Sequence, residues 1–153
     1  MPRIALDAQL LLLLLAGEVG CRLDEGTPKL KQYRYEDYEL LVEIVGNAGL
    51  VAIPNVLTEV SNLIGQETGF RADQLRCALH VFAVRADECY VPSRVAAARP
   101  EFNRLGLTDA AWLCVHEPRT TLWTDDIMLH IAATAIGVDC RNFSHLRVER
   151  GHL

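Results

Sequence analysis

Residues 3–17 have the sequence Arg3-Ile4-Ala5-Leu6-Asp7-Ala8-Gln9-Leu10-Leu11-Leu12-Leu13-Leu14-Leu15-Ala16-Gly17. The apolar run at 3–6 ends at a polar residue and predicts a strand, and residues 8–16 predict a helix that stops at Gly17. The leucine run is far shorter than the ~20 apolar residues of a membrane helix, and no A-x-A cleavage site follows it. We therefore expect a helix that is buried on most of its sides beneath a sheet.

The chain beyond this stretch alternates between helical spacing and short branched or apolar runs. Residues 18–34 are polar and form the longest expected loop. The expected helices are 35–47, one that begins at Pro54, 72–86, a short one capped by Ser93, 109–116 capped by Thr108, and 126–136. The expected strands are 50–53, 89–91 (weak), 121–124 and 138–143. This alternation predicts an α/β fold with three layers, α/β/α, around a mostly parallel central sheet.

Composition is that of an ordinary folded protein. The chain has 153 residues, the length of one domain, and 50% of them are hydrophobic, so we expect a single domain over 1–153. A formal net charge of −5 argues against general electrostatic binding to DNA. The five cysteines are odd in number and form no C-x-x-C pair, which favours a reduced, cytoplasmic setting over disulfides or zinc.

Acidic residues recur where expected strands end or helices begin. They are Asp7, Glu59, Asp109 and the pair Asp125-Asp126, each within a short apolar setting. In open parallel sheets the site lies at the carboxyl ends of the strands, so these carboxylates should converge on one cleft. Their mutual repulsion would raise some pKa values unless a cation neutralised the group. A hard divalent cation such as Mg²⁺ binds carboxylate oxygens and water, which suggests chemistry on phosphates.

Simpler structural explanations exist for single members of this set. A helix N-terminus favours a carboxylate, which would account for Asp109 after Thr108 and equally for Asp126. Glu59 alone could be a solvated helix residue. Asp7 is the hardest to explain in this way, because nothing near it in sequence pairs with it.

Four stretches of the chain resemble, in order, the PIN domains, and in particular the VapC-type toxin ribonucleases. The stretches are 6–11, 53–63, 105–111 and 122–126, and the segment 137–143 is similar to the last strand of that family. Together they span nearly the whole chain. The resemblance implies a metal-dependent endoribonuclease, the toxin of a type II toxin–antitoxin pair, with RNA as substrate and a cognate antitoxin protein as partner.

The resemblance also implies roles for individual residues. Asp7, Glu59, Asp109 and Asp126 would be ligands for one or two Mg²⁺ or Mn²⁺ ions, and Asp125 competes with Asp126 for the fourth position. Thr124 would offer a hydroxyl to the cleft, and Asn55 and Asn62 would orient Glu59. Gln9 departs from the family pattern, which has a small polar residue two positions after the first aspartate.

Other interpretations remain open at this stage. A catalytically silent binding module would keep the fold, and a receiver-like signalling domain is a further alternative, although no lysine follows the last expected strand. Basic and aromatic residues between Lys29 and Tyr38 could hold single-stranded RNA or could simply be solvated. The apolar content of helices 35–47 and 72–86, and the resemblance itself, lead us to expect a homodimer.

Overall fold

Strand β1 (Arg3–Leu6) lies at the centre of a parallel sheet in the computed structural model, which describes residues 1–153. It pairs with β2 (Gly49–Ala52) on one side and β4 (Thr120–Thr124) on the other. The two edges are β3 (Asp87–Glu88), beside β2, and β5 (Cys140–Asn142), beside β4. The strand order is therefore β3-β2-β1-β4-β5, and every pair is parallel, as the sequence predicted.

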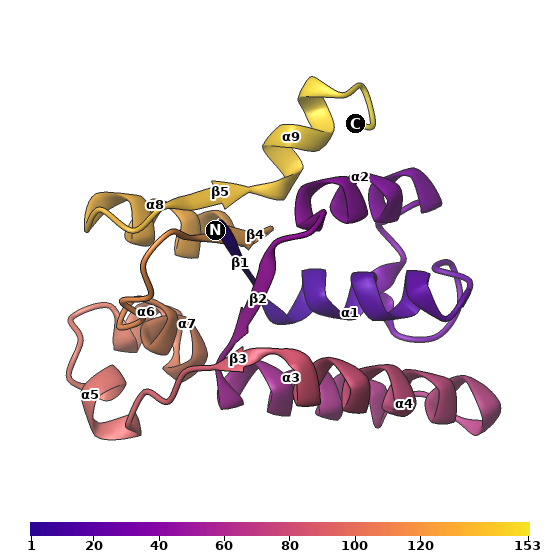
Figure 1. Ribbon diagram of the computed structural model, residues 1–153, viewed down its shortest axis with the longest axis horizontal. Coiled ribbons are helices and arrows are strands. Elements are labelled where there is room, and N and C mark those ends of the chain that lie inside the picture. The colour runs from indigo at the N-terminus through magenta and orange to yellow at the C-terminus, as the bar shows by residue number, and fades with distance from the viewer.

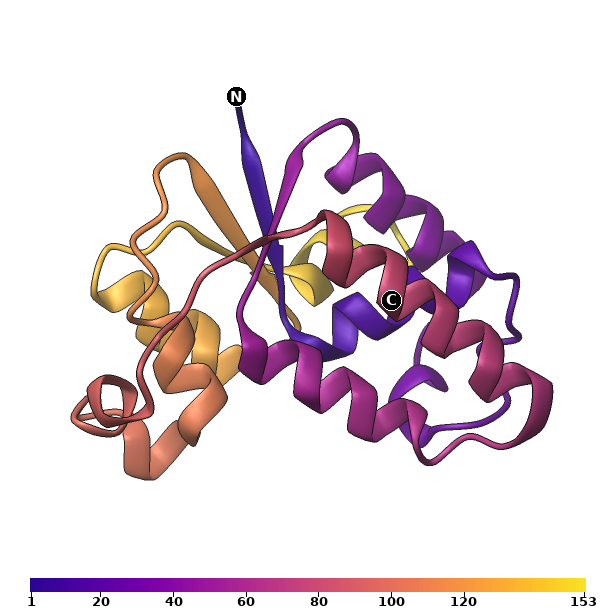
Figure 2. The same cartoon turned by 60° about the horizontal axis from the view of Figure 1, so that its bottom comes forward.

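Helices cover both faces of this sheet. They are α1 (Ala8–Glu18), the 3₁₀ turn η1 (Pro28–Leu30), α2 (Tyr35–Val45), α3 (Pro54–Ile64), α4 (Gly69–Arg85), α5 (Ser93–Ala97), α6 (Phe102–Leu105), α7 (Leu107–Trp112), α8 (Ile127–Ala135) and α9 (Phe143–Glu149). Helices α1 to α4 lie on one side of the strands and α5 to α8 on the other in both ribbon views (Figures 1 and 2). The fold is α/β with three layers, which confirms the expected class.

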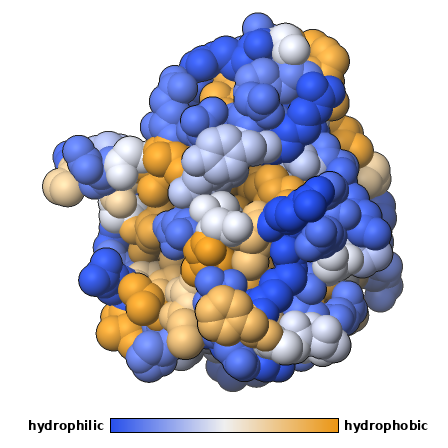
Figure 3. All heavy atoms as spheres, turned by 90° about the vertical axis from the view of Figure 1, so that its right-hand side faces the viewer, coloured by the Kyte–Doolittle hydropathy of each residue, from blue (hydrophilic) through white to orange (hydrophobic).

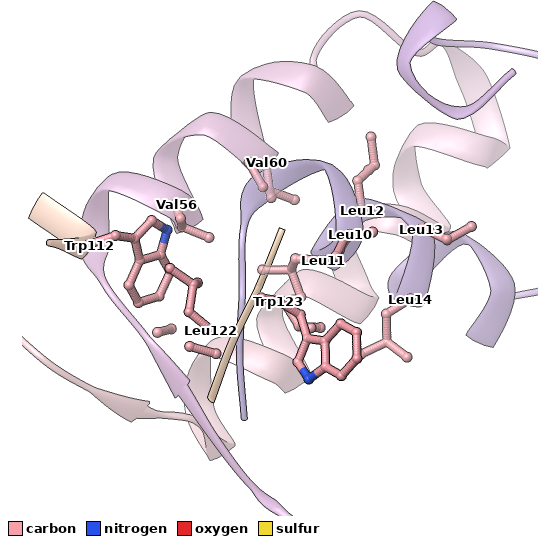
Figure 4. Packing of buried hydrophobic residues seen from close by; sticks show 14 of the residues in the cluster. Leu10, Leu11, Leu12, Leu13, Leu14, Val56, Val60, Trp112, Leu122 and Trp123 are labelled. Carbon is pink, nitrogen blue, oxygen red and sulfur yellow. The ribbon is translucent and has the colours of Figure 1, made fainter. Parts of the chain in front are cut away.

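Helix α1 forms the centre of the core. Eight of its residues are buried, among them the whole leucine run, because the helix contacts β1 and packs between α2, α3 and α4. Its side chains and those of Val60, Leu122 and Trp123 belong to one continuous cluster of 36 buried residues (Figure 4). The prediction of a helix buried on most sides is confirmed, and none of the helices combines the length and hydropathy that a membrane span requires.

Gly17 does not end α1, contrary to expectation. The helix continues to Glu18, and an added Cβ at Gly17 would lie 2.1 Å from the ring of Tyr38. Glycine is present because Tyr38 of α2 packs directly on the helix backbone. The chain leaves the helix at Gly20, whose φ of +73° is one that residues with side chains rarely adopt.

Several other predicted elements differ at their ends. Helix α4 begins three residues before the predicted start, and Pro92 rather than Ser93 is the N-cap of α5. The weak strand predicted at 89–91 is instead β3, two residues earlier. The last predicted strand is cut short because Asn142 caps α9, accepting a hydrogen bond from the N–H of His145 at 3.0 Å. Helix α9 itself was not predicted.

Helix α9 is joined to α2 by a buried cluster that we call the ion-pair clasp, formed by Asp37, Arg147 and His152. The guanidinium of Arg147 donates to both carboxylate oxygens of Asp37, at 3.0 and 3.1 Å. His152 Nδ1 lies 2.9 Å from Asp37 Oδ1. Asp37 also accepts from the N–H of Arg34, so that its lone pairs are well satisfied. The clasp fixes the C-terminal segment against the helical layer.

Candidate active site

The expected acidic residues lie at the carboxyl edge of the sheet, beside the point where the strand order reverses. From β1 the chain proceeds to β2 on one side, whereas β4 leads to β5 on the other side. Ligands of open α/β sheets bind at such a switch point, because the loops there diverge and leave a crevice. Asp7 follows β1 directly and Asp126 closely follows β4, so the two residues flank this crevice.

A hollow of about 550 Å³ opens at this point, which we call the carboxylate cleft. It contains all four principal carboxylates predicted from the sequence. Its lining is Asp7, Ala8, Gln9, Lys29, Glu59, Asn62, Leu63, Gln66, Leu105, Gly106, Leu107, Thr108, Asp109 and Asp126. The structure therefore brings together Asp7, Glu59, Asp109 and Asp126 from four separate segments of the chain.

Asp7 is held in a fixed position at the start of α1. It is the N-cap residue, and its Oδ1 accepts from the N–H of Leu10 at 3.3 Å. Its other oxygen accepts a hydrogen bond from the hydroxyl of Thr124, which is fully buried at the end of β4. Burial raises the pKa of Asp7 to about 6, although the hydrogen bonds from Thr124 and Leu10 act to lower it.

The adjacent residues Asp125 and Asp126 point to different places. Asp126 lines the cleft and caps α8, accepting from the N–H groups of Met128 at 2.8 Å and Leu129 at 3.3 Å. Asp125 does not line the cleft, because its oxygens accept hydrogen bonds from the hydroxyls of Tyr33 and Ser144. Geometry thus places Asp126, rather than Asp125, among the cleft carboxylates.

Glu59 reaches the cleft from α3 and is held there by Thr108. The hydroxyl of Thr108 donates to Glu59 Oε1 at 2.7 Å. The prediction that Thr108 caps a helix at 109–116 is wrong. The helix is α7, which spans Leu107–Trp112 with Gly106 as its N-cap, and the side chain of Thr108 bonds to Glu59 instead. The hydroxyl of Thr108 thus bonds to Glu59, which is distant in sequence, and not to the backbone of its own helix.

Asp109 is the least compensated member of the set. Burial, together with the charges of Asp126, Asp7 and Glu59, raises its pKa to about 7. No hydrogen-bond donor contributes to this shift in the opposite direction. A cation in the cleft would oppose both causes of this shift and would promote ionisation of the carboxyl group.

The donor set agrees in kind with a hard divalent cation. All four groups offer oxygen, and their crowding is visible in the raised pKa of Asp109. No group of three or more His, Cys, Asp or Glu side chains is arranged closely enough to hold a metal ion as it stands. Mg²⁺ usually takes only one or two carboxylates and keeps several waters, so the residues present fit such an ion without a complete protein cage.

The expected supporting residues separate into two groups. Thr124 bridges the site, since its hydroxyl donates to Asp7 and accepts from the N–H of Asp126 at 2.9 Å. Asn62 lines the cleft near Glu59, whereas Asn55 lines a neighbouring hollow. Neither asparagine makes a hydrogen bond to Glu59, whose only side-chain partner is Thr108.

Gln9 lines the cleft and is anchored by residues of the 18–34 loop. Its Nε2 lies 3.0 Å from the hydroxyl of Tyr33 and 3.4 Å from the carbonyl of Lys29. Tyr33 is buried and in turn donates to Asp125. Gln9, which is longer than the small polar residue of the family pattern, is thus held in the cleft by Tyr33.

Lys29 is the one cationic side chain that lines the cleft, and the sequence offered it only as part of a mixed basic and aromatic cluster. Hydrogen bonds from two residues at the start of the α4 region hold the loop that carries Lys29. Glu67 Oε1 accepts from the N–H of Thr27 at 2.8 Å. The guanidinium of Arg71 donates to the carbonyls of Arg22 and Glu25. Lys29 is exposed and takes part in none of the ion pairs of the structure. In the sequence, Lys29 could have been singled out by Pro28 before it, which begins the 3₁₀ turn that contacts α1.

Comparison of the chain with protein-family models, with curated proteins and with solved structures yields no match.

Proposed function

We propose that this protein is a metal-dependent endoribonuclease. The observation that carries the proposal is the convergence of Asp7, Glu59, Asp109 and Asp126 on one cleft at the switch point of the sheet. Two of these carboxylates have pKa values raised toward neutrality, and strongly perturbed groups in a cleft are candidates for function. The proposal also follows from the resemblance of four segments to PIN domains, since those segments contain the same four carboxylates.

The chain's own residues orient the carboxylates for this role. Thr124 directs one oxygen of Asp7, the first turn of α8 holds Asp126, and Thr108 holds Glu59. Asp109 lies between them without a donor of its own. Asp7, Asp109, Asp126 and Glu59 would hold one or two Mg²⁺ or Mn²⁺ ions, directly or through water, and the metal when bound would activate water and neutralise charge on the phosphate.

RNA would enter a cleft that is acidic at its base and carries one cation at its edge. Lys29 is exposed and free of ion pairs, so its ammonium group can contact a backbone phosphate of the substrate. Gln9, Asn62 and Gln66 add neutral polar groups along the same lining. These groups suit the sugar and phosphate of a polynucleotide held over the carboxylates.

The experiment that tests the proposal is cleavage of a structured RNA with Mn²⁺ or Mg²⁺. We expect Asp7→Asn to lose at least ~10²-fold in rate, the size seen when an electrostatic group at a transition state is removed. Asp73→Asn is the matched control, since Asp73 is an exposed aspartate on α4 outside the cleft. Activity that survives both Asp7→Asn and an excess of chelator would contradict the proposal.

The alternative of a silent binding module predicts a different result from a metal titration. In the nuclease, calorimetry should detect Mn²⁺ binding that Asp7→Asn weakens and Asp73→Asn leaves unchanged. A silent module should show no carboxylate-dependent binding of Mn²⁺.

The proposed toxin role and homodimer follow from the resemblance and from the surface. A cognate antitoxin should be encoded by a small open reading frame adjacent to this one.

Apolar side chains reach the surface on the face shown in Figure 3, and Phe70, Val81 and Val84 of α4 are exposed. We expect light scattering at micromolar concentration to show a dimer, and a species of only 17.0 kDa would contradict this.

A further inference from the structure

A second hollow of about 570 Å³ adjoins the carboxylate cleft, and we call it the side groove. It lies between the start of α3 and the segment that links β3 to α5. The two hollows share Glu59 and Thr108, whose side chains are joined by the 2.7 Å hydrogen bond. A chain molecule that lies over the carboxylates can therefore continue into the side groove past these two residues.

The chemistry of the side groove differs from that of the cleft. Apart from the shared Glu59, its lining carries no charged side chain, which makes it unsuited to phosphate or metal. Asn55, Thr58 and Ser93 supply an amide and two hydroxyls that can both donate and accept hydrogen bonds. Such groups complement the edge of a nucleobase, which presents donors and acceptors in one plane.

Tyr90 supplies an aromatic face beside these polar groups. It lines the side groove and is 77% exposed, so its ring packs against little of the protein. Two residues later Pro92 begins the turn into α5, and Cys89 is tied to the sheet by an N–H bond to the carbonyl of Ala52 at 2.8 Å. The backbone that carries Tyr90 is thus held on both sides while the ring remains uncovered.

We propose that the side groove is a base-binding subsite for single-stranded RNA, in which one unpaired base stacks on Tyr90 and presents its edge to Asn55 and Ser93. The inference rests on the proposed function, because it takes the RNA backbone to lie over the carboxylate cleft. Stacking of bases on aromatic side chains is the common device for holding single strands, and it works for every base because each has a π-face. The subsite favours an unpaired base, since a paired base would first have to lose its partner and its neighbouring stacks before it could reach Tyr90.

Binding of a short unpaired RNA oligonucleotide to the Asp7→Asn protein tests this without interference from cleavage. Tyr90→Ala should weaken binding about tenfold, the lower part of the range for one stacked base, and Tyr90→Phe should retain the affinity because the ring is kept. Val148→Ala is the control for the loss of an exposed side chain elsewhere, since Val148 on α9 is exposed and lines neither hollow.

Oligonucleotides that carry one abasic position locate the stacked base. We expect one abasic position to lower the affinity about tenfold when Tyr90 is present and to change it almost not at all in Tyr90→Ala. Such a result identifies a direct contact, because the two changes then remove the same interaction. Unchanged affinity in Tyr90→Ala, or abasic effects that simply add to it, overturns the subsite.

The same experiments separate this inference from the proposed function. Metal-dependent cleavage by wild type together with Tyr90-independent binding would refute the subsite and leave the nuclease standing. Tyr90-dependent binding without metal-dependent cleavage would support the subsite and contradict the nuclease. An oligonucleotide that is neither bound nor cleaved would overturn both.

Discussion

The carboxylate cleft and the ion-pair clasp both place aspartates inside the protein, but they treat the charge in opposite ways. In the clasp, burial would raise the pKa of Asp37, yet hydrogen bonds from Arg147, the Arg34 N–H and His152 hold that pKa below its usual range. In the cleft, burial and neighbouring carboxylates raise the pKa of Asp109 to about 7, and no donor opposes them.

This difference distinguishes a structural carboxylate from one available for chemistry. Asp37 has its cation and its donors built into the protein, so its charge stabilises the fold. The cleft has no arginine or histidine in its lining, and its one lysine is exposed at the edge. Carboxylates gathered without a cation of the protein's own are what the proposed metal site requires.

The largest effect is expected in the clasp. Arg147→Met should lower the free energy of unfolding by about 3–5 kcal/mol, because it removes the guanidinium that donates to both oxygens of the buried Asp37 and leaves only His152 and the Arg34 N–H beside that charge. Chemical denaturation at neutral pH measures this. Arg150→Met is the control, since Arg150 pairs with Glu43 at the exposed surface and should change little. Equal losses in the two variants would mean that the clasp does not stabilise the fold as its burial suggests.

We expect a divalent metal ion to stabilise the folded protein by binding in the carboxylate cleft and not at the ion-pair clasp. A cation that binds only the folded protein adds about 2.7 kcal/mol at a hundredfold excess over its Kd. We expect Mn²⁺ to raise the melting temperature of wild type and of Asp37→Asn by similar amounts, and to leave that of Asp7→Asn nearly unchanged. A shift retained in Asp7→Asn would place the metal elsewhere.

The two regions should also differ in their response to pH. The raised pKa values of Asp7 and Asp109 mean that the metal-free folded state binds more protons than the unfolded state between about pH 4 and about pH 7. The cleft therefore lowers stability as pH rises through this window, on the order of 2 kcal/mol for the coupled pair after solvent screening. The lowered pKa of Asp37 acts in the opposite sense, and its stabilisation is lost as pH falls below about 4.

Melting curves of wild type and of the double variant Asp7→Asn/Asp109→Asn, measured from about pH 5 to about pH 8 without metal, isolate the contribution of the cleft. Wild type should lose stability relative to the double variant as pH rises. Parallel curves would show that the carboxylates do not interact as the structure indicates.

The alternation of strands and helices was readable from the sequence because β1 and α1 have strong local patterns. The ends of elements were less predictable where a distant residue is involved: Gly17 lies inside α1, where its missing Cβ leaves room for Tyr38, and the hydroxyl of Thr108 donates to Glu59. Helix α9 was missed although Asn142 is an ordinary N-cap residue, because the apolar run before it had been assigned to a longer strand.

The four cleft carboxylates were predicted because each follows a strand or lies in the early turns of a helix, so topology alone brings them together. The residues around them depend on long-range contacts. Asp125 turns away from the cleft because Tyr33 and Ser144, far from it in sequence, offer hydroxyls. Lys29 and Tyr90 enter their hollows through loop paths that no local periodicity describes.

Asp109 is the carboxylate on which the proposed cation site depends most, because no hydrogen-bond donor offsets its raised pKa. Thermal unfolding of Asp109→Asn at about pH 8, with and without Mn²⁺, tests that site most directly. We expect the variant to be more stable than wild type by about 1 kcal/mol without metal, because a like charge has been removed from the cleft, and to lose the Mn²⁺ response. A variant that is less stable than wild type without metal and still stabilised by Mn²⁺ would contradict the proposed site, since Asp109 would then act as a helix-terminal residue of α7 and not as part of a metal site.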